Sequence, residues 1–139
     1  MSNSRDRASL LDIASSAQKV LQYKGNMDKI AFLADDKTQS AIVFQLLIIG
    51  EAVKRLSPEL RSQNSDIPWS LIARMRDNLI HRYDDIDLDE VWKTSNEDIP
   101  TLLIAFGTST ARRINAILRT LQKPGCSIRS ISSRCYARK

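Results

Sequence analysis

Apolar residues recur at helical spacing along most of the chain, which predicts a series of amphipathic helices. The first stretch, from about Asp6 to Lys24, places its apolar residues on one helical face: Leu10, Ile13, Ala14, Ala17, Val20 and Leu21. A later stretch, from Lys37 to about Leu56, is apolar almost all round between positions 41 and 53. Such a helix is buried on most sides, either at the centre of a bundle or at the contact between two copies.

Polar signals mark where the helices begin. Asp28, Asp35 and Ser57 each precede a helical stretch, where a side-chain oxygen can cap the N-terminus. The run from Asp66 to Trp69 repeats this start signal, and the run from Asp84 to Asp87 ends the helix that follows.

The last helical region is expected from near Asp87 or Asp89 to about Gln122. Pro100 must kink or restart it, and Asn96 is a possible cap for the restart. The whole pattern predicts an all-α domain, a bundle of four main helices plus short ones.

Composition favours one cytoplasmic domain. The chain has 139 residues, 42% of them hydrophobic, with four glycines and four prolines. No apolar run reaches the roughly 18 residues of a membrane span, and the polar N-terminus lacks a signal-peptide pattern. Cys126 and Cys135 have no zinc-ligand spacing with the single histidine, so we interpret them as ordinary thiols.

The net charge of +5 belongs to the end of the chain. Residues 1–122 contain 16 Lys or Arg and 16 Asp or Glu, whereas residues 123–139 carry five basic residues and no acid. We therefore expect a domain over 1–122 and a basic, flexible tail over 123–139. The tail can add affinity for RNA or can simply be solvated.

The segment from Arg76 to Tyr83 carries the candidate chemistry. It contains the only histidine, His81, five residues after Arg76 and two before Tyr83. An arginine can hold a phosphate, and an imidazole can move protons near neutral pH. A phosphodiester is the substrate that such a set suits, although a solvated charge pair and a surface histidine would give the same spacing.

Helical angles restrict how these side chains can meet. Arg76 and His81 lie about 140° apart on a continuous helix, since each residue turns about 100°. Asp77 is four residues before His81 and can accept a hydrogen bond from the imidazole, which would orient it. Joint action of Arg76 and His81 therefore requires unwinding near His81 or a symmetric dimer that brings two motifs together.

Two further residues are unusual for their helix. Gly50 costs helix stability unless something packs closely against it. Glu51 next to it either is a solvated surface acid or faces a polar cleft. We count Glu51 and Asn78 as candidate cleft residues.

The motif resembles the Arg-x4-His-x-Tyr signature of HepT-like toxins in the HEPN superfamily. The resemblance extends over residues 6 to 122 through ordered landmarks: 32–35, 49–52, 67–69 and 87–92. It implies a helical homodimer whose two motifs line one cleft. Arg76 and His81 would be the catalytic pair of a ribonuclease that uses no metal or other cofactor.

The same resemblance implies a partner. HepT-like proteins are toxins of HEPN/MNT toxin–antitoxin pairs of a type VII-like kind. Their antitoxin is an MNT-type nucleotidyltransferase, which can silence the toxin by transferring AMP to the motif tyrosine, here Tyr83. The alternative is a non-catalytic helical subunit that binds nucleotides or a protein partner.

Overall fold

A computed structural model of the protein describes residues 4–106, and the regular elements within that range are all helices. The long helices are α1 (Ser4–Lys24), α3 (Asp36–Lys54) and α5 (Trp69–His81). The shorter ones are α2 (Lys29–Leu33), α4 (Pro58–Gln63), α6 (Leu88–Lys93), the π-helix η1 (Thr94–Asp98) and α7 (Ile99–Ala105). The predicted all-α fold is confirmed.

Some expectations lie outside the described residues. These are the end of the last helix near Gln122, the domain boundary at 122–123, the basic tail and its two cysteines. Between residues 4 and 106, no helix is long and apolar enough to cross a membrane.

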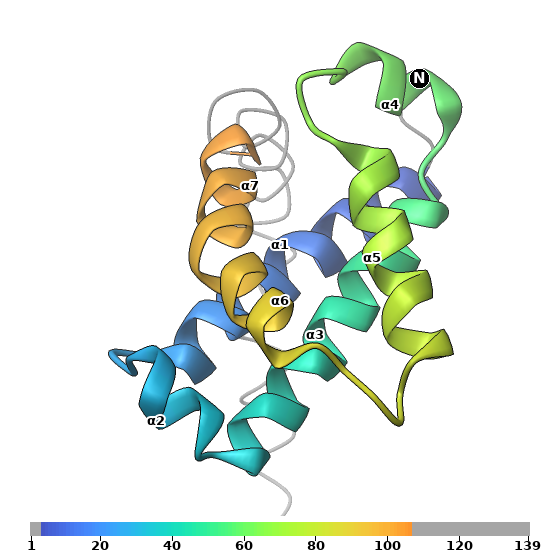
Figure 1. Ribbon diagram of the computed structural model, residues 1–139. Helices are drawn as coiled ribbons and strands as arrows, with labels where there is room; N and C mark the ends of the chain where they lie inside the picture. The colour runs from blue at the N-terminus through green and yellow to red at the C-terminus, as the bar shows by residue number, and fades with distance from the viewer. Residues whose placement is uncertain (1–3, 107–139) are drawn as a thin grey trace, which may run out of the picture.

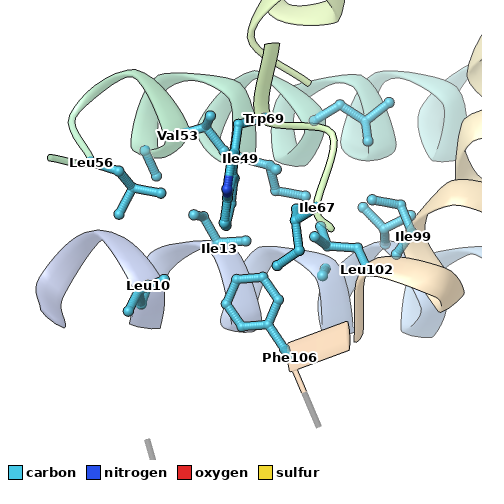
Figure 2. Packing of buried hydrophobic residues seen from close by; sticks show 14 of the residues in the cluster. Leu10, Ile13, Ile49, Val53, Leu56, Ile67, Trp69, Ile99, Leu102 and Phe106 are labelled. Carbon is cyan, nitrogen blue, oxygen red and sulfur yellow. The ribbon is translucent and has the colours of Figure 1, made fainter. Parts of the chain in front are cut away.

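Helix α3 is the central element. It packs against α1 on one side and α5 on the other, while α7 also lies against α1 (Figure 1). The core forms where these helices meet, and Figure 2 shows Trp69 pointing between α3 and α1 towards the side of Phe106. The two rings meet edge to face, with centroids 6.4 Å apart. Trp69 thus anchors the first turn of α5 in the core.

Helix starts agree with the sequence signals at Asp28, Asp35 and Ser57, whereas α5 begins at Trp69 without a side-chain cap. Asp28 accepts a hydrogen bond from the Ala31 amide at 2.8 Å, and Asp35 accepts one from the Thr38 amide at 3.1 Å. The Thr38 hydroxyl also donates to Asp35, and these bonds lower the pKa of the Asp35 carboxyl. Each cap satisfies a backbone amide that the first helical turn leaves without a partner.

The interpretation of Asn96 as a helix cap is wrong. The chain stays helical from α6 through η1 into α7, and Asn96 instead accepts a hydrogen bond from Lys24 Nζ at 3.1 Å. Pro100 lies in the first turn of α7, directly after the π-helix. A proline ring clashes with the carbonyl four residues back, and the wider π turn relieves that clash without breaking the helix.

Candidate active site

The site begins where α3 and α5 cross. Gly50 on α3 is buried directly against Arg76 on α5. A Cβ atom added at Gly50 would lie 2.1 Å from the Arg76 Cβ and 2.8 Å from its Cγ, far inside normal contact distance. The close packing that would explain a glycine at this position is therefore present, and it brings the motif arginine on α5 against α3.

Arg76 is held by two carboxylates. Its Nη2 lies 3.1 Å from Glu51 Oε2, and its Nη1 donates to Asp77 Oδ1 at 2.9 Å. The Arg76 side chain keeps a quarter of its surface exposed, so the guanidinium remains accessible to solvent. Glu51 is itself half exposed, and its carboxylate faces the motif arginine.

Asp77 receives a second cation from the neighbouring helix. Lys54, near the end of α3, donates from its Nζ to the same Asp77 oxygen that binds Arg76. The hydrogen bond from Lys54, followed by the one from Arg76, lowers the pKa of the Asp77 carboxyl. Asp77 therefore stays ionised to a lower pH than an ordinary aspartate, and it joins α3 to α5.

The sequence-based expectation for Asp77 was a hydrogen bond to His81. Among residues 4–106, the hydrogen bonds and ion pairs of Asp77 go to Lys54 and Arg76, and none joins it to His81. Sequence reasoning did not single out Lys54. The only indication in the sequence that Lys54 belongs to the site is its position three residues after Glu51. That spacing puts both side chains on one face of α3.

His81 is the last residue of α5, and its side chain is exposed. The Arg82 amide closes the helix by donating to the Asn78 carbonyl at 3.0 Å, after which the chain turns away. The helix therefore ends at His81, just before the run from Asp84 to Asp87 that was expected to end it. Tyr83 consequently lies off the helix, with 79% of the residue exposed.

Tyr83 stands over the first half of α3. It lines a shallow hollow of about 470 Å³ together with Phe44, Leu47 and Ile86. Phe44 is 60% exposed although it lies on the most apolar helix of the chain. The outer face of α3 therefore presents apolar surface beside the motif, so α3 is not buried all round.

Asn78 lies on another side of α5. With Met75 and Leu79 it lines a groove of about 620 Å³ between α5 and the segment from α6 to α7. Asn78 follows Arg76 by two residues, or about 200° around the helix, so the two side chains leave α5 in different directions. The structure does not bring Asn78 to the Arg76 cluster.

Together these positions make a surface that suits a phosphate. Two cations, Arg76 and Lys54, are fixed where α3 and α5 cross, and the exposed His81 ends α5 about one helical turn after Asp77. A guanidinium and an ammonium can bind phosphate oxygens, and the imidazole can exchange protons with a bound group. In the part of the chain that the structure describes, no group of three or more His, Cys, Asp or Glu side chains is placed to hold a metal ion.

Comparison with known proteins shows the family of the chain. Residues 13–108, more than half of the chain, match the family model described as "Ribonuclease HepT-like". The chain belongs to the HepT-like ribonuclease family. That match includes the whole motif from Arg76 to Tyr83 and confirms the resemblance drawn from the sequence.

Individual HepT-like relatives are similar over most of their length. A Thermococcus cleftensis protein named "Probable ribonuclease HepT" is 42% identical over 93 residues, which is 67% of this chain and 84% of the relative. A Methanocaldococcus jannaschii protein named "Putative RNase MJ0127" is 36% identical over 94 residues, or 68% of this chain and 78% of the relative. No solved structure matches the chain at a significant level.

Proposed function

We propose that this HepT-like protein is an RNA endonuclease that needs no metal ion and acts in the cytoplasm as the toxin of a toxin–antitoxin pair. One observation carries the proposal. The motif arginine is fixed at the surface by Glu51 and Asp77, while His81 stands exposed at the end of the same helix. Cleavage of a phosphodiester requires a cation and a proton-transfer group that can reach the same phosphate.

The reaction uses the nucleophile that RNA itself contains. His81 takes the proton of a 2′-hydroxyl, and the 2′-oxygen attacks the adjacent phosphorus. Arg76 stabilises the additional negative charge on the phosphorane. The bond to the 5′-oxygen then breaks, that oxygen takes up a proton, and the products are a 2′,3′-cyclic phosphate and a 5′-hydroxyl end.

A homodimer supplies the second proton-transfer group. His81 of one copy acts as the base, and His81 of the partner copy protonates the leaving oxygen. The exposed apolar face of α3, with Phe44 exposed and Leu47 and Ile48 half buried, supports a contact between copies beside the motif. A symmetric contact there would bring two Arg76–His81 sets towards one cleft.

Tyr83 is the proposed site of silencing by an MNT-type antitoxin. Its exposure supports access for a nucleotidyltransferase. The Tyr83 hydroxyl oxygen attacks the α-phosphorus of ATP, a new phosphodiester bond forms, and pyrophosphate leaves with its electron pair. The added AMP places bulk and negative charge two residues after His81, where it would compete with the RNA phosphate.

Induced expression tests the proposal. We expect growth arrest and fragmented total RNA with the wild-type protein, and neither effect with His81→Ala or Arg76→Ala at equal expression. If the wild-type protein harms neither growth nor RNA, the nuclease proposal is wrong, and a non-catalytic subunit that binds nucleotides or a partner replaces it.

Silencing needs its own experiment. Co-expression with an MNT-type nucleotidyltransferase should restore growth and add the mass of one or more AMP units to the peptide that contains Tyr83. Tyr83→Phe should stay unmodified under the same conditions. Modification at a different residue would contradict the assignment of Tyr83.

A further inference from the structure

Within residues 4–106, Lys54 is the one cation of this site that comes from α3 and not from the motif. Its Nζ crosses to α5 and shares Asp77 Oδ1 with Arg76. Glu51, Arg76, Asp77 and Lys54 therefore form a row of alternating charge across the two helices. Two cations bound to one oxygen lie only a few ångströms apart, close enough for both to reach one phosphate group.

Helical geometry places Lys54 on the histidine side of Arg76. Asp77 is about 100° around α5 from Arg76, whereas His81 is only about 40° beyond Asp77. Because Lys54 is bonded to Asp77, its ammonium lies against the face of α5 that Asp77 shares with His81. A single copy of the chain therefore has a cation, Lys54, on the same side of α5 as His81.

Both cations keep donors for a ligand. An ammonium has three N–H donors, and Asp77 uses one of those on Lys54. A guanidinium has five, and Glu51 and Asp77 occupy two of those on Arg76. The Lys54 side chain is 36% exposed, more than that of Arg76. A phosphate can therefore bind both cations while the carboxylates stay in place.

We propose that Lys54 is a second phosphate-binding residue of the site, and that Asp77 is a positioning residue that holds Lys54 and Arg76 towards the same RNA phosphodiester. This inference rests on the proposed nuclease function. It adds a residue outside the Arg-x4-His-x-Tyr motif and gives Asp77 a role towards the two cations. The ligand class is the backbone phosphate of RNA, bound without regard to base sequence.

The competing explanation is that Lys54 only pins α3 to α5. Lys54→Gln separates the two explanations, because glutamine can still donate to Asp77 but carries no charge. Lys54→Arg keeps the charge. Arg55→Ala is a matched control, because the adjacent Arg55 forms a similarly exposed ion pair with Asp12, at 3.3 Å.

Binding is measured on His81→Ala protein, which is expected not to cut the probe. A fluorescent single-stranded RNA is titrated at several salt concentrations, and the slope of log affinity against log salt counts the phosphate contacts. Each contact to single-stranded RNA contributes about 0.7 to that slope. Lys54→Gln should lower the slope by about this amount and weaken binding several-fold at low salt, whereas Lys54→Arg and Arg55→Ala should match the parent.

Cleavage rates and thermal melting complete the test. With His81 intact, Lys54→Gln should lower kcat/KM for RNA about tenfold, with a melting temperature close to that of Arg55→Ala, which loses a similarly exposed ion pair. If Lys54→Gln instead binds and cleaves RNA as Arg55→Ala does, the inference is overturned while the proposed function stands. If the wild-type protein neither binds nor cleaves RNA, the proposed function is wrong and this inference is overturned with it.

Discussion

A single residue, Asp77, links the two helices of the site. Its carboxylate binds Lys54 from α3 and Arg76 from its own helix, and both bonds lower its pKa. A carboxylate with two cationic partners stays charged where an ordinary one begins to take up protons. The motif arginine is thus fixed in direction before any RNA phosphate arrives.

The pKa of Asp77 gives a direct prediction. Because it lies below the ordinary value of 3.8, the ion pairs stabilise the folded state above that pH and are lost as the pH falls through the lowered pKa. Lys54→Ala removes the larger cause and should raise the pKa of Asp77 towards 3.8. Carbon NMR titration of the Asp77 carboxyl measures this, with Arg55→Ala as the control. An unchanged Asp77 titration in Lys54→Ala would show that the two side chains are not paired in solution.

Among the helices, the close crossing of α3 and α5 determines the geometry of the site. Gly50 is buried, and the space where its Cβ would stand is already filled by the Arg76 side chain. The helices can approach this closely only without a side chain at position 50. The distance between Glu51 and Arg76 therefore depends on a residue that makes no polar contact with either.

Gly50→Ala tests that dependence. The added methyl group must push α5 away from α3, and overpacking of this kind costs about 1–3 kcal/mol of unfolding free energy. Nuclease activity should fall further than stability, because Arg76 moves with α5. Ser70→Ala, at an exposed position in the first turn of α5, is the control and should change neither property. Full activity in Gly50→Ala would mean that the crossing distance does not matter for catalysis.

Sequence predicted the local features of these elements and missed those that join them. The caps at Asp28 and Asp35 were predictable because each donor lies three residues after its acceptor. The Lys54–Asp77 bond joins residues 23 apart in sequence on two different helices, so spacing alone gave no signal for it. The helix cap predicted at Asn96 was wrong, because the π-helix accommodates Pro100 and no new helix starts there.

On the surface of the whole molecule, the site lies next to exposed apolar side chains. Phe44 on α3 and Tyr83 after α5 line the same hollow, and both are more than half exposed. Exposed aromatic side chains of this kind suit contact with another protein surface. The proposed homodimer would cover this surface and bring a second His81 near the first.

Phe44→Glu tests the dimer. A charge in the contact should shift the protein from dimer to monomer, because burying an unpaired carboxylate is unfavourable. Light scattering after gel filtration measures the mass, and cleavage activity should fall together with dimer content. Ile30→Glu is the control, since Ile30 is 80% exposed on α2 and does not line the hollow beside Tyr83. A monomeric wild-type protein with full activity would contradict the dimer.

The central claim is that His81 and Arg76 cleave RNA through its own 2′-hydroxyl. The most direct measurement incubates purified protein and a metal chelator with a synthetic RNA, and separately with the same sequence methylated at every 2′-oxygen. We expect the wild-type protein to cut only the unmodified RNA and to leave 2′,3′-cyclic phosphate ends, and His81→Ala and Arg76→Ala to cut neither. Cleavage of the methylated strand, or equal cleavage by His81→Ala, would contradict the account.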